Sequence, residues 1–124
     1  MWNYGLVVLG GGIGAGIRYW MSGAVQRWAG GLFPYGIFVV NSLGCLVIGV
    51  LMSSLEERFL INPSLRVFLT IGILGGFTTF SSFSYETISL LRDAEYFYAT
   101  LNVLLTTVTC LTATYIGTVI GEVI

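Results

Sequence analysis

The sequence predicts an all-α integral membrane protein with four transmembrane helices, the third of them broken. Composition is the first reason: of the 124 residues, 56% are hydrophobic and only 9% are charged. A soluble domain carries about 25% charged residues, so this chain lacks the charge for a water-covered surface and its apolar solvent is membrane lipid. Length is the second reason, because four apolar runs approach the roughly 20 residues that a helix needs to cross a bilayer.

Short polar connections separate the four predicted spans, so we expect a single transmembrane domain. The spans cover residues 4–25, 34–55, 65–91 and 96–121. No positively charged segment precedes the first run, which predicts a retained helix rather than a cleaved signal. Pro34 suits the first turn of the second helix, where a missing N–H costs nothing, and Ser64 is the candidate N-cap of the third. The runs do not alternate in hydrophobicity, which argues against a β-barrel.

The arginines are balanced between the two ends of such a bundle. Four spans place Arg58 and Arg66 on one side of the membrane, and Arg27 and Arg92 on the other. Orientation normally follows an excess of Lys and Arg on the cytoplasmic side. Here the sides carry two arginines each, or two against three when Arg18 is included. The balance predicts insertion in both orientations and an antiparallel, dual-topology homodimer, with a single orientation set by other features as the alternative.

The glycines of the first span predict close helix packing. Gly10 and Gly14 form one small-xxx-small pair, and Gly12 and Gly16 form a second. Small residues let helix backbones approach closely in lipid, where packing drives association. The same stretch matches a loose dinucleotide-binding pattern, but that motif needs a strand, a helix and an acid about 20 residues on. The first acid here is Glu56, so a nucleotide site is not expected.

Several other site classes are also disfavoured. Cys45 and Cys110 lie in apolar runs far apart in the sequence, and their spacing suits neither a zinc site nor a disulfide framework. We interpret them as small buried apolar residues. The chain has no His and a net charge of −1 without a basic block, which disfavours enzyme chemistry and nucleic-acid binding.

Three polar residues interrupt spans that lipid should keep apolar. A charge near the bilayer centre costs about 2.5 to 3.5 kcal/mol on insertion scales, so Arg18 either reaches the interface or has a function. Glu86 either pairs with an arginine or stands at a pore mouth. Asn41 needs hydrogen-bond partners in lipid, and serves either as a link between helices or as a donor along a path for a polar solute.

The third span is the most unusual. Between Gly75 and Ser84 it combines two adjacent glycines, five hydroxyls and three phenylalanines. This composition favours a break in the helix, and broken helices occur at membrane depth only where protein or a cavity covers the freed backbone groups. Phe80 and Phe83 share a face of the following helix. Because aromatic rings have a positive edge, these side chains can attract an anion without carrying charge.

At these residues the sequence resembles the fluoride channel family, whose members are called Fluc or CrcB proteins. The resemblance covers nearly the whole chain. It rests on Gly-Ile-Arg-Tyr-Trp around Arg18, on Val-Val-Asn ending at Asn41, and on the run from Gly75 to Glu86. The run in the third span is the most specific of the three.

The resemblance implies a protein of the cell membrane, plasma or inner, that forms antiparallel dimers with two fluoride pathways. Phe80 and Phe83 match phenylalanines whose ring edges line the pores, and Asn41 matches a pore-lining amide of the second helix. Four further residues match hydroxyl positions near the polar track of the family: Ser81, Ser82, Ser84 and Thr114.

The resemblance also implies a structural sodium ion at the dimer interface, and no organic cofactor. Gly75 and Thr78 match the residues whose backbone carbonyls hold that ion. Arg18 matches the first-helix arginine, and Glu86 matches a glutamate beyond the phenylalanines. The chain departs from the family at three positions, where Thr, His and Ser are frequent: Ile37, Thr106 and Cys110. These departures leave some vestibule and fourth-helix contacts open.

Fluoride is small and strongly hydrated, so a selective path must supply dense hydrogen-bond donors while excluding the larger chloride. We therefore predict a channel that passes fluoride passively out of the cytoplasm and is not an enzyme. The alternative is a small multidrug resistance transporter, which is also a four-helix dual-topology dimer. Such transporters need a membrane-embedded glutamate in the first helix, whereas this first helix carries Arg18 and no acid.

Overall fold

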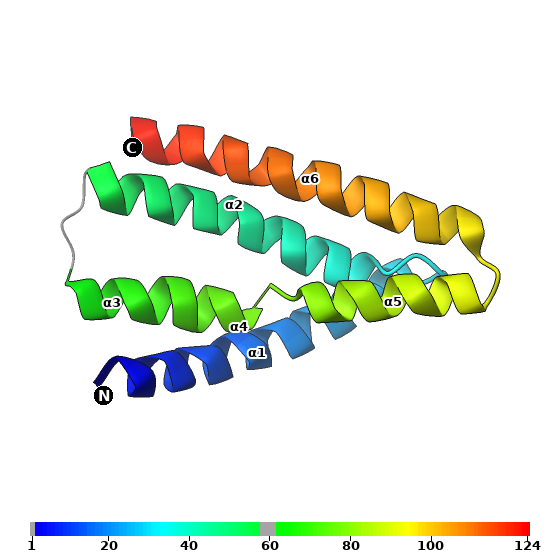
Figure 1. Cartoon of the computed structure of the whole chain (residues 1–124), viewed down its shortest axis with the longest axis horizontal. Coiled ribbons are helices and arrows are strands. Elements are labelled where there is room, and N and C mark those ends of the chain that lie inside the picture. The colour runs from blue at the N-terminus through cyan, green and yellow to red at the C-terminus, as the bar shows by residue number, and fades with distance from the viewer. Residues whose placement is uncertain (1, 58–61) are drawn as a thin grey trace.

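The computed structural model describes residues 2–57 and 62–124, which form four long helical segments and no strand. Helix α1 covers Trp2–Ala29, α2 covers Tyr35–Glu57 and α6 covers Tyr96–Val123. The third segment consists of α3 (Pro63–Val67), η1 (Phe68–Leu74), α4 (Gly75–Phe77) and α5 (Phe80–Arg92). Figure 1 shows α2 and α6 side by side, with α1 crossing the first half of the third segment. The prediction of an all-helical chain with four long helices is confirmed.

Three helices are long and apolar enough to cross a membrane within the described ranges: Tyr35–Leu55, Pro63–Arg92 and Tyr96–Val123. Helix α1 has 28 residues, but its many glycines, its aromatic residues and Arg18 lower its apolar character. The prediction that this first helix crosses the membrane is therefore supported by its length alone. The chain is a multi-pass membrane protein.

The ends of the third segment differ in detail from the sequence-based expectation. Asn62, rather than Ser64, is the N-cap, because its side chain accepts a hydrogen bond from the Ser64 N–H at 2.8 Å. Pro63 then occupies the first turn. The N-cap prediction for Ser64 was wrong because Asn62, two residues earlier and directly before Pro63, satisfies a free N–H group of the first turn.

The break in the third segment lies at Thr78 and Thr79, not at the adjacent glycines. Gly75 and Gly76 are both helical, whereas Thr78 (φ −121°, ψ 114°) and Thr79 (φ −127°, ψ 118°) are extended. β-Branched threonine favours extended backbone. The π-helix η1, which precedes the break, consists of the seven residues from Phe68 to Leu74. Such a distortion is often found near functional sites.

Glycines bring helix backbones into direct contact at two places. A Cβ on Gly10 would lie 2.9 Å from the Cα of Gly72, and one on Gly14 would overlap the Ile73 carbonyl. The α2–α6 pair meets in the same way, with Gly117 against the backbone of α2. Gly12 and Gly16 instead face open space. Of the two predicted glycine pairs, the first packs within the chain and the second does not.

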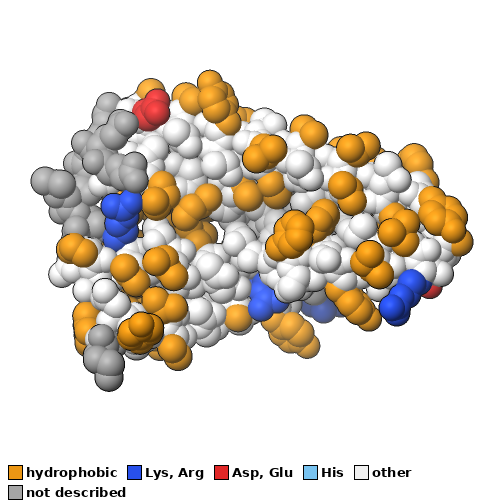
Figure 2. All heavy atoms as spheres, in the orientation of Figure 1, with side chains coloured by type: hydrophobic (Ala, Val, Ile, Leu, Met, Phe, Trp, Pro, Cys, Tyr) orange, Lys and Arg blue, Asp and Glu red, His pale blue; other side chains and the backbone are white. Residues whose placement is uncertain are grey.

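The outer surface is apolar and carries few charges. Figure 2 shows hydrophobic side chains spread over one face of the molecule, and Trp28 and Tyr19 are 89% and 84% exposed. Such a surface suits lipid or a second protein chain. Both termini lie at the end where α2 finishes and α3 begins (Figure 1), as four crossings require. Arg58, which entered the predicted charge balance, lies outside the described residues.

Candidate functional site

Asn41 holds the break in the third segment open. Its side-chain Oδ1 accepts a hydrogen bond from the Thr79 N–H at 2.7 Å, and its Nδ2 donates to the Thr79 carbonyl at 3.2 Å. The amide thus pairs with an extended residue as a neighbouring β-strand would. Asn41 is only 7% exposed, and these bonds replace the helical partners that Thr79 has lost. The expected role as a link between helices is observed, and one Nδ2 hydrogen remains for another acceptor.

Arg18 and Thr79 satisfy further backbone groups at the break. The Arg18 Nε donates to the Gly76 carbonyl at 3.1 Å, so the guanidinium of α1 is directed at the broken helix. The Thr79 hydroxyl accepts a hydrogen bond from the Ser82 N–H at 3.3 Å and caps the start of α5. An interruption in lipid is therefore covered by one charged and two polar side chains.

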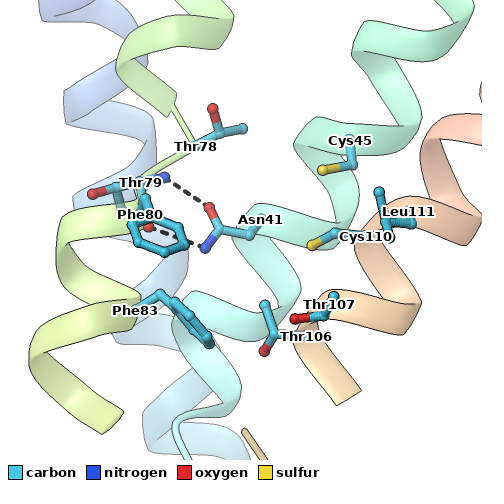
Figure 3. A pocket seen from close by; sticks show the side chains of 10 residues that line it. All are labelled: Asn41, Cys45, Thr78, Thr79, Phe80, Phe83, Thr106, Thr107, Cys110 and Leu111. Carbon is cyan, nitrogen blue, oxygen red and sulfur yellow. Dashed lines mark hydrogen bonds between the residues drawn. The ribbon is translucent and has the colours of Figure 1, made fainter. Parts of the chain in front are cut away.

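A cavity of about 400 Å³ lies beside the break, between α2, α6 and α5. Figure 3 shows that Asn41 reaches from α2 to Thr79 and that the ring of Phe80 lies next to this pair. The wall comes from α2, α5, α6 and the extended residues of the break, and its residues are Asn41, Cys45, Thr78, Thr79, Phe80, Phe83, Thr106, Thr107, Cys110 and Leu111. Three of the predicted anion-pathway residues, Asn41, Phe80 and Phe83, are thus brought together.

The two phenylalanines form a pair at the start of α5. Their ring centroids are 5.4 Å apart and the ring planes are inclined by 50°. The Phe80 side chain is 79% exposed, so one side of the cavity lacks cover within a single chain. Figure 3 shows Phe83 one turn below Phe80, facing the same space.

The four predicted hydroxyl residues differ in their partners and in their distance from the cavity. Ser81 pairs at 2.9 Å with the hydroxyl of Thr79, which is a residue of the cavity wall. Ser82 contributes its N–H to the Thr79 cap, whereas Ser84 is exposed and does not line the cavity. Thr114 lies outside the cavity wall and donates to the Cys45 carbonyl at 3.2 Å, which joins α6 to α2.

A buried polar chain joins α5 to α6 below the cavity, and sequence reasoning missed its central residue. Asn102 is 2% exposed; its Nδ2 donates to Thr87 Oγ1 at 2.9 Å, and its Oδ1 accepts from Thr106 at 3.2 Å. Thr87 in turn donates to the Phe83 carbonyl at 2.8 Å. The argument that an amide in lipid needs partners applied to Asn102 as much as to Asn41 and identifies it.

Glu86 stands apart from this cavity. It lines two smaller cavities of about 310 and 220 Å³ together with Gln26, where α5 passes the end of α1 and the start of α2. Ile37, one of the departures from the family, lines the smaller of the two. Glu86 therefore does not belong to the wall formed by the phenylalanines.

The two carbonyls predicted to hold a cation have both lost their usual helical donors. In a continuous helix the Gly75 carbonyl accepts from the N–H of Thr79, and the Thr78 carbonyl accepts from that of Ser82. The Thr79 N–H donates instead to Asn41, and the Ser82 N–H to the Thr79 hydroxyl. Carbonyl oxygens freed in this way at a helix break are suited to a hard monovalent cation.

Comparison with known proteins places these features in a family. The family model described as "CrcB-like protein, Camphor Resistance (CrcB)" matches residues 5–118. The chain belongs to the CrcB family. It is 46% identical over 112 residues to the "Fluoride-specific ion channel FluC" of Geotalea uraniireducens (strain Rf4), which covers 90% of each chain.

Further CrcB relatives carry the same description. The chain is 49% identical over 107 residues to the fluoride-specific ion channel FluC of Geotalea daltonii (strain DSM 22248 / JCM 15807 / FRC-32), 86% of each chain. It is 42% identical over 118 residues to that of Magnetococcus marinus (strain ATCC BAA-1437 / JCM 17883 / MC-1), 95% of this chain and 96% of the other. Membership of the CrcB family confirms the resemblance and favours the channel prediction over the small multidrug resistance alternative.

Proposed function

We propose that the chain is a fluoride-selective channel whose ion path passes through the cavity beside the break. The observation that carries the proposal is the arrangement of Asn41, Phe80 and Phe83 around that cavity, at the point where a membrane helix is interrupted. The descriptions of the CrcB relatives support it. The proposed activity is passive transport rather than catalysis.

Hydrogen-bond donors for a dehydrated anion remain available at the cavity. One Nδ2 hydrogen of Asn41 is used by the Thr79 carbonyl, which leaves the other for an anion. The hydroxyls of Thr79 and Ser81 bond to each other, and this contact uses only one of their two protons. The N-terminus of α5, which begins at Phe80, adds partial positive charge.

Phenylalanine rings suit a path that must discriminate between halides. The positive ring edge attracts an anion but has no charge and no N–H or O–H donor, so it holds the ion weakly enough for release. Fluoride is small enough to make close contact with hydroxyl, amide and ring-edge hydrogens together. Chloride, which is larger, cannot fit the same donors without displacing the rings.

The proposed functional unit is an antiparallel, dual-topology homodimer. Phe80 is largely exposed, and apolar side chains cover the outside of the chain, so a second copy would complete the path. A tag at the C-terminus, assayed for accessibility from each side of the membrane, tests the topology. Labelling from both sides is expected, and labelling from one side alone would exclude dual topology.

A structural sodium ion is the proposed inorganic component of the dimer. Gly75 and Thr78 would hold it through their backbone carbonyls, and a second copy would contribute the same pair. The cation would offset the partial negative charge of these carbonyl oxygens and link the two chains. Replacing sodium by a large organic cation is expected to reduce the dimer fraction in size-exclusion chromatography; an unchanged dimer fraction would contradict this.

Flux of fluoride and chloride from proteoliposomes tests the proposed function. Efflux is read with ion-selective electrodes after an ionophore for the counterion is added, and protein-free liposomes are the control. We expect rapid fluoride efflux and chloride efflux at the level of the control. Equal rates for the two anions would contradict selectivity.

A further inference from the structure

Two cysteines that are far apart in the sequence lie in the wall of one cavity. Cys45 belongs to α2 and Cys110 to α6, both thiols are free, and both line the space that Phe80 and Phe83 also border. The two side chains therefore border the same space although they come from different helices. Figure 3 shows both sulfur atoms directed from their helices toward the side on which Asn41 lies.

The backbones that carry these thiols are held firmly together. The Thr114 hydroxyl donates to the carbonyl of Cys45 itself. Gly117, two turns beyond Cys110 on α6, lies directly against the backbone of α2 near Val50. Because glycine contacts leave no flexible side chain between the helices, the separation of the two sulfur atoms is set by the fold rather than by side-chain motion alone.

We infer that Cys45 and Cys110 form a two-thiol site for a soft, thiophilic cation. Thiolate ligands select soft metal ions, and ions such as Hg²⁺ bind two thiolates in a linear arrangement without a third ligand. Among the described residues no group of three or more His, Cys, Asp or Glu side chains could hold a metal ion. A cation that needs four ligands, such as Zn²⁺, is therefore not expected to bind here.

The binding step is balanced in charge. Each thiol gives up its proton to water as its sulfur bonds to the metal, so one Hg²⁺ replaces two protons and the S–Hg–S product is neutral. A neutral product suits a poorly hydrated wall, where an uncompensated charge is costly. The metal would fill the space between α6 and Asn41, and so obstruct an ion that passes the phenylalanines.

Mercury binding to the full-length reconstituted chain tests the site. Mass spectrometry under native conditions is expected to find one mercury atom per chain, with both thiols protected from monobromobimane. Zn²⁺ at the same concentration is expected to protect neither thiol. Two mercury atoms per chain, or one shared between two chains, would overturn the assignment.

Block of transport by Hg²⁺ tests whether the two-thiol site lies on the ion path. Only this part of the inference rests on the proposed fluoride channel. Submicromolar Hg²⁺ is expected to reduce fluoride efflux at least tenfold, with recovery after dithiothreitol. In Cys45→Ser and in Cys110→Ser, each compared with its own untreated rate, half-block should need at least ten times more Hg²⁺. Equal sensitivity of wild type and both variants would overturn the inference. An untreated protein that passes no fluoride would contradict the proposed function, while the mass measurement would still judge the site.

Discussion

The two halves of the third segment, before and after its break, are held in different ways. The first half packs against α1 through backbone contacts at Gly10, Gly14 and Gly72. The second half, α5, is attached to α6 through the side chains of Asn102 and Thr87. Glycine contacts fix the position of a helix but provide no polar side chains. The side-chain hydrogen bonds of α5, in contrast, position Phe83 and leave polar groups beside it. The first half therefore serves as the frame, and under the proposed function the second half carries the residues that would meet the ion.

The largest expected effect comes from adding one methyl group to the frame. In Gly14→Ala the new Cβ would overlap the Ile73 carbonyl, and a backbone atom cannot turn away as a side chain can. We expect destabilisation of at least about 3 kcal/mol, the upper end for overpacking, measured by thermal unfolding in detergent. Gly5→Ala adds the same methyl group to α1 with no atom within 4 Å and is the matched control. Equal stability of the two variants would contradict the role of the first half as the frame.

The next effect concerns the joint between the halves. Asn41→Leu removes both bonds to the Thr79 backbone, and each buried group left unpaired costs about 1 to 3 kcal/mol. We expect lower thermal stability and at least a tenfold loss of fluoride efflux.

Asn41→Asp separates the two roles of this residue. A carboxylate oxygen can still accept the Thr79 N–H, so the variant should fold better than Asn41→Leu, but its negative charge should repel fluoride. Efflux from proteoliposomes as fast as wild type in Asn41→Asp would show that the anion does not pass this side chain.

A smaller effect is expected at the attachment of α5 to α6. Asn102→Leu and Thr87→Val each remove one partner of a 2.9 Å bond, and each should be less stable by about 1 to 3 kcal/mol. Because the partners share one bond, the double variant should cost less than the sum of the two single changes. Strict additivity in a double-mutant cycle would mean that this bond does not hold the second half. Thr112→Ala, on the exposed face of α6, should change stability by less than about 0.5 kcal/mol.

Much of this arrangement could be predicted from the sequence, because lipid makes polar residues conspicuous. Asn41, Arg18 and the hydroxyls of the third span were identified on that principle. Their partners could not be predicted. Nothing local indicates that Arg18 donates to Gly76, or that Asn41 pairs with Thr79, since both bonds depend on how α1 and α2 pack.

The sequence predicted a break in the stretch before Phe80 but not which residues leave the helix. The glycines and the hydroxyl cluster both favour the break, but Gly76 is helical and lies in close contact with Gly11 of α1, so its role is packing. The extended residues are the threonines that follow it. The proximity of Cys45 and Cys110 was equally hidden, because it arises from the α2–α6 contact and not from spacing along the chain.

Fluoride efflux from proteoliposomes containing Phe83→Ile is the most direct test of the account. Phe97→Ile, a matched change at an exposed ring outside the cavity, serves as the control. Isoleucine fills space but has no positive ring edge, so the account predicts at least a tenfold loss of fluoride efflux in Phe83→Ile and a rate close to wild type in Phe97→Ile. Wild-type efflux in Phe83→Ile, with the protein folded, would contradict it.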